Sequence, residues 1–273
     1  MSAGPERLVL LGHPLNHSLS PLFQNAALRA AGIHASYEAL DVPRSAIEQT
    51  IESLRRERAA GNVTTPYKAV VFDACDRLTS TAKAVGAVNT FWTAIDGAIV
   101  GDNTDAGGFQ AAVKELIDQP RTGEVVALLG AGGAAAAVLH AVERWPAARV
   151  RVYSRTPERA EQLVKRFKVD SEVVTTAAAA AVGATLVVNA TPVGMRAEDV
   201  APVAVEELSS SAAVLDLTYR TGETALVRHA RARGLRAMDG LTMLVEQGAL
   251  SFERWFGMVP DRDAMWDAIK AQR

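Results

Sequence analysis

The sequence predicts an α/β protein of two domains, the second of which is a doubly wound, Rossmann-type domain. Short runs of Val, Ile and Leu alternate with longer segments of helical period, as in proteins with a largely parallel sheet. A glycine-rich turn stands between one such run and an alanine-rich helix. At about 150 residues per domain, 273 residues correspond to about 1.8 domains, which allows two of ordinary size.

The composition indicates a soluble globular protein and argues against two classes of partner. Lys and Arg number 29 against 31 Asp and Glu, so no strong positive charge favours nucleic acid or anionic lipid. No apolar stretch approaches the roughly 20 residues needed to span a bilayer. The single cysteine, Cys75, cannot form an intrachain disulfide, and we expect it to pack in the core of a cytoplasmic protein.

The first part of the chain reads as strands separated by helices. We interpret Ser20 as the N-cap and Pro21 as the first residue of a helix over Leu22–Ala31, which stops at Gly32. Pro43 opens a second helix that runs to about residue 58. The expected strands are Leu8–Leu11, Ser36–Val42 and Asn62–Thr64, followed by a hairpin of Ala87–Thr93 and Ala98–Gly101 around Asp96-Gly97.

Two more helix starts follow in this part of the chain. Thr65-Pro66 repeats the cap-plus-proline signal and begins a helix that carries Tyr67 and Lys68. Asn103-Thr104-Asp105 caps a helix to about Ile117. The polar stretch 118–124 then reads as a surface connection into a new unit.

The second part of the chain repeats a strand-helix-strand pattern. Right-handed crossovers would build its strands into one doubly wound sheet. The expected strands are Val125–Leu129, Arg149–Tyr153, Thr185–Asn189, Val214–Leu217 and Leu235–Met238. The expected helices are an alanine-rich one after the glycine turn, Pro157–Phe167, Glu223–Arg233, Gly240–Trp255 and a last one capped by Asp261. The alanine run Ala177–Ala181 is either a helix or the approach to one.

The glycine-rich turn predicts a dinucleotide site. Gly130, Ala131, Gly132, Gly133 and Ala134 lead into Ala135, which matches G-x-G-x-x-A, the pattern of a tight turn that lets backbone approach a pyrophosphate. The N-terminus of the following helix would hold the phosphates. A purely structural turn and an S-adenosylmethionine site are the alternatives.

The end of the next strand favours NADP over NAD. NAD sites usually place Asp or Glu about 20 residues after the glycine turn, to hold the ribose 2′-hydroxyl. Here the sequence is Ser154-Arg155-Thr156, with Arg159 one helical turn further. A guanidinium can grip a 2′-phosphate through planar, charge-assisted hydrogen bonds. The alternative is that both arginines are ordinary surface residues.

Nine segments together resemble the shikimate dehydrogenase family, and they occur in the family's order over nearly the whole chain. None of them alone would decide the assignment. They are Gly12-His13-Pro14 with His17-Ser18-Leu19-Ser20-Pro21, Asn62 to Lys68, Gly86 to Thr90, Gly101 to Asp105, Gly130 to Gly133, Ser154-Arg155-Thr156, Asn189 to Pro192, Asp239 to Leu244, and Gln247.

The resemblance implies an NADP-dependent enzyme that reversibly reduces 3-dehydroshikimate to shikimate, in the biosynthesis of chorismate and aromatic amino acids. Lys68 would handle the proton at the ketone oxygen, and Asp105 would orient its ammonium. Without the resemblance, a lysine at a helix start is usually a solvated residue, and an Asp after Asn-Thr is often only a cap.

Other binding residues follow from the same resemblance. Ser18 and Ser20 would bind the substrate carboxylate, and Thr64, Asn89 and Gln247 its ring hydroxyls. Further residues implied by the resemblance are Tyr219 for the substrate and Thr191, Leu217 and Gly240 for the cofactor. We expect a substrate-binding domain of residues 1–105 with 240–273, and an NADP-binding domain of residues 106–239.

Several alternatives stay open. A quinate/shikimate dehydrogenase that uses NAD shares most of these motifs, and a sensor could keep the dinucleotide turn without chemistry. The family more often has alanine at the position of Gly248 and bulkier apolar residues at 65–67, which leaves specificity undecided. His13 and His17 lack acidic or cysteine partners at ligand spacing, so we expect no metal. We expect a monomer or a homodimer.

Overall fold

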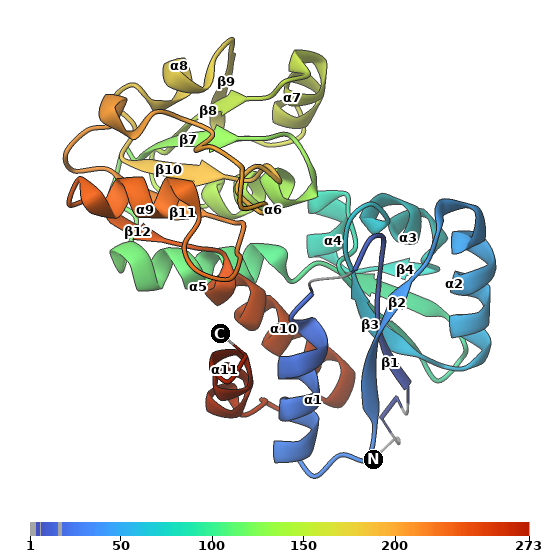
Figure 1. Cartoon of the computed structure of the whole chain (residues 1–273). Coiled ribbons are helices and arrows are strands. Elements are labelled where there is room, and N and C mark those ends of the chain that lie inside the picture. Colours follow the sequence, from blue (N-terminus) through green and yellow to red (C-terminus); the bar gives the residue numbers. More distant parts are fainter. Residues whose placement is uncertain (1–3, 6, 16–17, 273) are drawn as a thin grey trace. The chain divides into compact units, whose positions relative to one another are not determined.

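The chain forms two compact units, shown in Figure 1. The computed structural model describes residues 4–5, 7–15 and 18–272, so His17 lies outside the described residues. The first unit comprises residues 1–108 and 244–273, and the second comprises residues 109–243. The divisions fall inside two continuous helices, α5 (Asp105–Ile117) and α10 (Leu241–Phe256). The boundaries expected from the sequence stand at the starts of these same helices.

The first unit is built on a mixed six-stranded sheet of order β2-β1-β3-β5-β6-β4. Strand β1 pairs in parallel with β2 and β3, whereas β5 runs antiparallel to both β3 and β6. Its strands are β1 (Arg7–Gly12), β2 (Ser36–Asp41), β3 (Ala60–Val63), β4 (Arg77–Leu78), β5 (Thr90–Thr93) and β6 (Ile99–Asp102). The expected hairpin, β5 with β6, therefore pairs with β3 at the edge of the parallel group β2-β1-β3.

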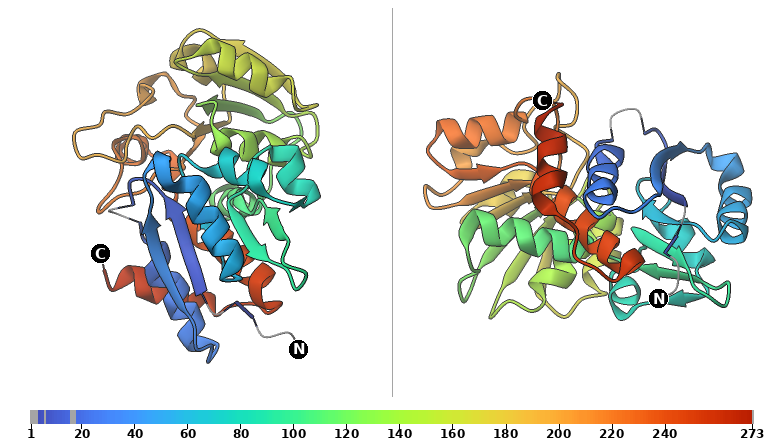
Figure 2. Two further views of the ribbon diagram at one scale, coloured as in Figure 1. Left: turned by 90° about the vertical axis from the view of Figure 1, so that its right-hand side faces the viewer. Right: turned by 90° about the horizontal axis from the view of Figure 1, so that it is seen from below.

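Helices cover this sheet, and the helices that follow residue 240 return to the first unit. Besides parts of α5 and α10, they are α1 (Ser20–Ala30), a 3-10 turn at Arg44–Ala46, α2 (Ile47–Arg56), α3 (Lys68–Ala74), α4 (Ser80–Val85) and α11 (Arg262–Lys270). In the views of Figures 1 and 2, α11 lies beside α1. Asp261 caps α11 as predicted, since its Oδ1 accepts a hydrogen bond from the Ala264 amide at 3.0 Å.

Two expected helix caps differ from the prediction, and the helix expected from Pro43 starts as the 3-10 turn before α2 begins at Ile47. Ser20 is not an N-cap but the first residue of α1, because the backbone already turns at Leu19, whose carbonyl accepts the Leu22 amide at 3.1 Å. Thr65 does not cap α3, which begins only at Lys68 after a turn in which the Tyr67 amide donates to the Thr64 carbonyl at 2.9 Å. The short elements β4 and α4 were not predicted from the sequence, since neither is long enough for a periodic pattern.

The second unit is built on a parallel six-stranded sheet of order β12-β11-β10-β7-β8-β9. Counted from β7, this is the doubly wound order of dinucleotide-binding domains, as predicted. Its strands are β7 (Val125–Leu129), β8 (Arg149–Tyr153), β9 (Asp170–Val174), β10 (Leu186–Asn189), β11 (Ala213–Asp216) and β12 (Arg236–Met238). Strand β9 was not predicted, because at the sheet edge it carries Asp, Ser and Glu in place of a continuous apolar run.

Small side chains let the helices of the second unit pack close to its sheet. The eight residues of α6 from Ala135 to Val142 are all buried, four of them alanine. The helices are α6 (Gly133–Val142), α7 (Pro157–Val164), α8 (Ala177–Ala181), a 3-10 turn at Val205–Glu207 and α9 (Ala225–Ala232). Burying such a helix on all sides contributes about 25 cal/mol per Å² of apolar surface removed from water.

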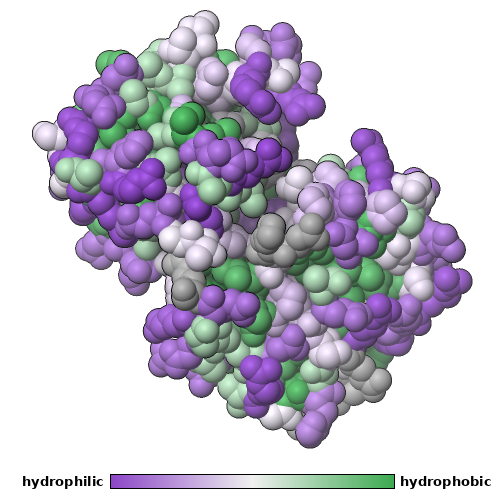
Figure 3. Space-filling model, in the orientation of Figure 1, coloured by the Kyte–Doolittle hydropathy of each residue, from purple (hydrophilic) through white to green (hydrophobic). Residues whose placement is uncertain are grey.

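Hydrophilic residues cover most of the face drawn in Figure 3, where apolar residues form small separate groups. The large exposed apolar side chains include Ile95, Met195 and Val200, which are scattered along the sequence. Scattered apolar residues of this kind are normal on a protein surface. Among the described residues, no helix has both the length and the apolar character that crossing a membrane requires.

Candidate functional site

The loops that carry the predicted catalytic residues meet at one edge of the first sheet. Because β1 and β3 are parallel, Gly12 at the end of β1 and Thr64 just after β3 lie at the same edge, where the Thr64 amide donates to the Leu11 carbonyl at 2.9 Å. Strand β5 runs in the opposite direction, so Asn89 precedes it at this edge, and the Val63 amide donates to the Asn89 carbonyl at 2.7 Å. Residues 103–105 follow β6 there.

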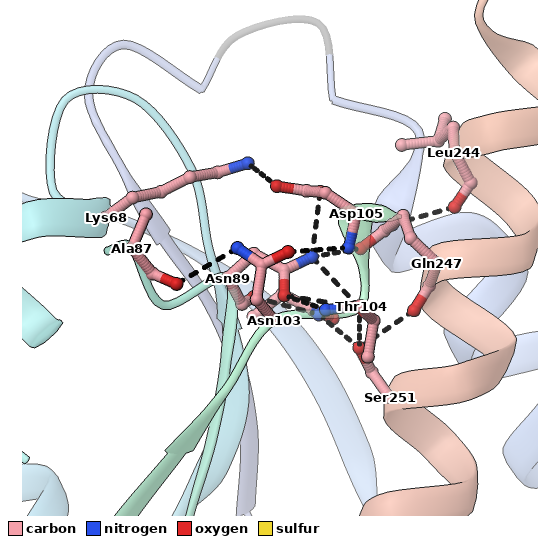
Figure 4. A network of polar contacts seen from close by, with 10 residues as sticks. Lys68, Ala87, Asn89, Asn103, Thr104, Asp105, Leu244, Gln247 and Ser251 are labelled. Atoms are coloured by element: carbon pink, nitrogen blue, oxygen red, sulfur yellow. Dashed lines mark hydrogen bonds and ion pairs between the residues drawn. The ribbon is translucent and has the colours of Figure 1, made fainter. Parts of the chain in front are cut away.

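Lys68 and Asp105 form an ion pair at this edge, as Figure 4 shows. The Lys68 Nζ lies 2.6 Å from Asp105 Oδ2, and only 7% of the Asp105 side chain and 21% of the Lys68 side chain are exposed. Breaking a pair this enclosed would leave a charge poorly solvated, so the two side chains constrain each other. The ammonium retains N–H donors that the single bond to Asp105 does not use.

Asn89 is the centre of the hydrogen bonds around this pair. Its buried side-chain amide nitrogen lies 2.9 Å from Asp105 Oδ1, 2.9 Å from Thr104 Oγ1 and 3.1 Å from Gln247 Oε1, so its two N–H groups are shared among three acceptors. The Asn89 Oδ1 accepts the Thr104 amide at 2.7 Å. Both oxygens of Asp105 are therefore held, one by Lys68 and one by Asn89. Two residues expected to bind the substrate, Asn89 and Gln247, are in contact with each other.

Helix α10 contributes two side chains to this network, Gln247 and Ser251. The Gln247 Nε2 donates to the Leu244 carbonyl at 2.7 Å, which orients its Oε1 toward Asn89. Ser251, one turn further, donates to the Gln247 carbonyl at 2.9 Å and lies 3.1 Å from Thr104 Oγ1. Ser251 was not among the predicted residues; helical spacing from Gln247 was the signal that could have indicated it.

Two more buried residues support the network and were not predicted as site residues. Asn62 donates to the Asn89 carbonyl at 3.2 Å and to Ser251 Oγ at 2.8 Å, and its Oδ1 accepts the Tyr37 hydroxyl at 2.9 Å. Asn103 accepts the Asp105 amide at 3.1 Å and donates to the Ala87 carbonyl at 3.0 Å. Each stands within a motif quoted for the family, but the sequence could not indicate which of their neighbours they bind.

The residues that precede Ser18 and Ser20 are tied to the sheet by Asp41. The Asp41 Oδ1 lies 2.5 Å from His13 Nδ1, and its Oδ2 accepts the Leu15 amide at 3.0 Å. These bonds, with that from His13 first, hold the pKa of Asp41 below its usual value. The Ser18 Oγ accepts the Ser20 amide at 3.3 Å, so the two serines expected to bind the carboxylate lie close together. Ser20 is buried and Ser18 is partly exposed.

The second unit contains the predicted glycine turn in the expected place, between β7 and α6. Gly130 has a φ of +115°, and a Cβ there would lie 2.8 Å from the Ala190 carbonyl oxygen, so only glycine fits. Gly132 differs, because a Cβ there would meet no protein atom within 4 Å. Its missing side chain leaves open space beside the N-terminus of α6, next to Ala131, Gly133 and Ala134, and this fits a ligand's pyrophosphate.

The arginines expected to hold a 2′-phosphate are exposed at the end of β8 and on α7. Ser154 Oγ accepts the Thr156 amide at 3.2 Å, and Thr156 is the N-cap residue of α7. Arg155 and Arg159 both expose their side chains near that helix start. The described residues 154–159 include one acid, Glu158, which lies in the exposed first turn of α7 and does not stand at the strand end.

The remaining predicted cofactor residues follow three neighbouring strands, β10, β11 and β12. Thr191 donates from its amide at 3.1 Å and its hydroxyl at 2.7 Å to Asn189 Oδ1. A Cβ on Gly240 would lie 2.3 Å from the Leu217 carbonyl oxygen, so these two residues touch through their backbones. Tyr219 is partly buried two residues after Leu217. Among the described residues, no group of three or more metal-ligating side chains occurs.

Comparison with known proteins decides the family. A shikimate dehydrogenase (NADP(+)) from Rubrobacter xylanophilus is 43% identical over 270 residues, which cover 96% of this chain and 95% of that protein. The chain belongs to the shikimate dehydrogenase family. The family expected from the sequence is thereby confirmed.

Family models and solved structures agree with this membership. The model described as shikimate dehydrogenase substrate binding domain matches residues 10–91, and that described as shikimate 5'-dehydrogenase C-terminal domain matches residues 240–270. Residues 125–219 match a model described as NADP oxidoreductase, coenzyme F420-dependent. The predicted fold class, α/β with a Rossmann-type second domain, is confirmed.

Two solved structures of similar proteins show the range of ligands. The shikimate 5-dehydrogenase from Thermus thermophilus, in complex with NADP(H) and shikimate, is 38% identical with a TM-score of 0.87, covering 97% of this chain and 98% of that one. A quinate dehydrogenase from Corynebacterium glutamicum in complex with NAD is 29% identical with the same TM-score of 0.87, covering 97% and 98%. The predicted activity and cofactor are those named for the first.

Proposed function

We propose that this protein is an NADP-dependent shikimate dehydrogenase that reversibly reduces the ring ketone of 3-dehydroshikimate. One observation carries the proposal: Lys68 Nζ lies 2.6 Å from Asp105 Oδ2 within a buried hydrogen-bond network at one edge of the sheet. An ammonium held in this way has N–H donors for a ketone oxygen and a proton to give to it.

Lys68 acts on the oxygen of the reacting carbon. In the reduction, a hydride adds to the carbonyl carbon, the C=O π electrons move to oxygen, and the Lys68 ammonium gives that oxygen a proton. In the oxidation, the neutral amine takes the proton from the shikimate hydroxyl. NADPH, when bound, supplies the hydride chemistry, and NADP⁺ accepts it in the reverse direction. The positive charge of Lys68 also stabilises the developing alkoxide before the proton moves.

Asp105, Asn89 and Gln247 orient this chemistry. Asp105 holds the ammonium in place and offers a carboxylate to a ring hydroxyl, while Asn89 fixes the second Asp105 oxygen at 2.9 Å. A substrate with several hydroxyls needs short donors and acceptors in a fixed array, and the bonds among these three side chains supply one. Thr64 and Tyr219 are proposed to contact the same substrate.

Ser18 and Ser20 are proposed to bind the substrate carboxylate. Their two hydroxyls stand at the start of α1, where backbone amides also favour an anion. The Asp41 contacts hold the residues that precede this loop.

The second unit is proposed to hold NADP(H) through groups whose arrangement fits it. The space at Gly132 beside the α6 N-terminus suits the pyrophosphate, together with Gly130, Ala131, Gly133 and Ala134. Arg155 and Arg159, with Ser154 and Thr156, suit the 2′-phosphate, since their guanidinium groups are exposed and no acid stands at the end of β8. Thr191, Leu217 and Gly240 are proposed to line the rest of the cofactor site.

A four-way assay tests the proposal. The absorbance of reduced nicotinamide is followed with shikimate and with quinate, each with NADP⁺ and with NAD⁺. We expect the highest kcat/KM for shikimate with NADP⁺. A preference for quinate with NAD⁺ would favour the activity named for the Corynebacterium relative. Oxidation of neither substrate with either nucleotide, by protein that still binds NADP⁺, would favour a non-catalytic sensor.

The proposal also covers the cellular location and the oligomeric state. We place the enzyme in the cytoplasm, because its only cysteine, Cys75, is a free thiol that needs no oxidising compartment. Cell fractionation tests this. We also propose a monomer or a homodimer, which light scattering at several protein concentrations would distinguish.

A further inference from the structure

Asp216, the last residue of β11, is a wholly buried carboxylate that the proposed chemistry does not use. Its Oδ1 accepts three hydrogen bonds: from Asn189 Nδ2 at 2.8 Å, from the Thr218 amide at 3.1 Å and from Thr218 Oγ1 at 2.9 Å. Asn189 is the last residue of the adjacent parallel strand β10, directly opposite Asp216 in the register. One oxygen atom therefore joins the ends of two neighbouring strands.

Asn189 extends this connection into the loop after β10. Its Oδ1 accepts both the amide and the hydroxyl of Thr191, and its Nδ2 also donates to the Val193 carbonyl at 2.8 Å. The Thr191 hydroxyl in turn accepts the Val193 amide at 3.2 Å. The backbone from 191 to 193 is thus fixed by an amide whose own orientation is set by Asp216.

Thr218 extends the connection in the other direction, to the loop after β12. Its carbonyl accepts the Gly240 amide at 2.9 Å, and Gly240 packs against the Leu217 backbone. Gly194, with a φ of +111°, packs against both residues. A Cβ there would lie 3.0 Å from Thr218 Oγ1 and 3.4 Å from Asp216 Oδ2. Three loops at the carboxyl ends of β10, β11 and β12 therefore converge on one carboxylate.

The buried carboxylate is costly, which stability alone does not explain. Burial raises the pKa of Asp216, while hydrogen bonding by Thr224, Thr218 and Asn189 acts in the opposite direction. In the described part of the chain, Oδ2 has no hydrogen-bond partner of good geometry. A buried oxygen without a partner loses its hydration without compensation. Local costs of this kind are expected where a functional arrangement is being held.

We propose that Asp216 is a positioning residue for the cofactor, which sets the mutual arrangement of the three loops that carry Thr191, Leu217 and Gly240. The inference rests on the proposed function, because that function assigns these three residues to NADP(H). Asp216 itself touches no cofactor in this proposal. It acts through Asn189 and Thr218, whose donors it orients.

Two substitutions at residue 216 test positioning. Asp216→Asn keeps an amide oxygen that accepts the three hydrogen bonds, whereas Asp216→Leu keeps the branched outline with bulkier methyl groups and accepts none. We expect the Kd of NADP⁺, measured by titration calorimetry without shikimate, to change by less than about twofold for D216N. For D216L we expect a rise on the order of tenfold, because misplacement of site groups by a fraction of an ångström weakens every contact they make.

Thr185→Val is the matched control in the same unit. Thr185 precedes β10 at the opposite end of the strand from Asn189 and bonds to the Val125 backbone at 3.0 and 3.2 Å. Its loss should lower the unfolding midpoint without altering the Kd of NADP⁺. If D216L did the same, with the wild-type Kd in a folded protein, Asp216 would be merely structural and the inference would be overturned.

A second variant keeps the test decisive if D216L does not fold. Asn189→Ala leaves Asp216 and Thr218 in place but disconnects the Thr191 loop, so the Kd of NADP⁺ should rise on the order of tenfold. An unchanged Kd for N189A would equally overturn the inference. A wild-type protein that fails to bind NADP⁺ or to oxidise shikimate would contradict the proposed function, whereas equal affinities of wild type and D216L would contradict only this inference.

Discussion

The two units hold their candidate sites by different means. In the first unit, side chains bind side chains: Asn89 alone donates to Thr104, Asp105 and Gln247, and Lys68 bonds to Asp105. In the second unit, the proposed cofactor turn is a backbone feature, in which a positive φ at Gly130 and an absent side chain at Gly132 make the space. The first unit therefore fixes the positions of side-chain groups, whereas the second unit shapes its candidate site with the backbone.

This difference predicts different consequences of substitution. Replacing a side chain in the first network removes a reacting group or leaves a buried polar partner unpaired, so turnover should fall steeply. Replacing an exposed side chain of the second unit leaves the backbone turn intact, so affinity or nucleotide choice should change while turnover remains. The four substitutions below stand in order of decreasing effect; Lys68→Ala and Arg155→Asp test this contrast, and the other two test how each unit is packed.

Lys68→Ala should have the largest effect. Loss of a positioned proton donor lowers kcat by on the order of 10² or more, with little change in the Kd of NADP⁺. Steady-state kinetics with shikimate measure the first quantity and calorimetry the second. Lys83→Ala, which removes an exposed lysine from α4, is the control and should behave as wild type. Near-normal turnover of K68A would remove Lys68 from the chemistry.

Gly248→Ala should destabilise the first unit. A Cβ on Gly248 would lie 2.4 Å from Phe23 Cε2, and Phe23 is fully buried in α1. Overpacking of this kind costs about 1–3 kcal/mol in the free energy of unfolding, which urea denaturation measures. Phe23→Leu combined with G248A should recover part of the loss. If the double variant were as unstable as the sum of the single ones, the Phe23 contact would not be the cause.

Arg155→Asp should change nucleotide choice without abolishing turnover. A carboxylate at the end of β8 repels a 2′-phosphate and can accept a ribose hydroxyl, so the ratio of kcat/KM for NADP⁺ to that for NAD⁺ should fall on the order of tenfold. Arg149→Asp, at the opposite end of the same strand, is the charge-matched control. An unaltered ratio in R155D would mean that other groups hold the 2′-phosphate.

His140 should give the smallest effect, on the pH dependence of stability. Burial in α6 lowers the pKa of its imidazole below the ordinary value of 6.5. The unfolded chain therefore takes up a proton at a higher pH than the folded one, so this contribution to stability is complete above pH 6.5 and is lost as the pH falls below it. His140→Gln should flatten the loss of urea stability between neutral and mildly acidic pH. An identical slope in both proteins would contradict this.

Much of the second unit could be predicted from the sequence because its signals are local. The strand before Gly130, the glycine turn and the alanine-rich helix are contiguous, and strand periodicity located β8, β10, β11 and β12. The sequence did not indicate the edge strand β9, because three of its five residues are polar and it has no continuous apolar run. The sequence also could not indicate that Asp216 joins three loops. Its partners Asn189 and Thr218 stand 27 and 2 positions away, which is no repeating spacing.

The site of the first unit could be predicted only through the family resemblance. Lys68 and Asp105 are 37 positions apart, and Asn89 and Gln247 are 158 apart, so neither pair has a pattern that a single sequence reveals. Even then, Asn62 and Ser251 were missed as partners, since their role depends on how β3 and α10 lie against each other. The cap assigned to Ser20 was wrong because the backbone already turns at Leu19, one residue before it.

The return of α10 to the first unit bears on the order of events during synthesis. The second unit is one contiguous segment, residues 109–243, and all its parts are synthesised before the segment 244–273. The first unit receives Gln247, Ser251 and the α11 partner of α1 only from that last segment. Although it begins first, it can be completed only last, so a chain that ended at residue 243 would contain every residue of the second unit but would lack the last segment of the first.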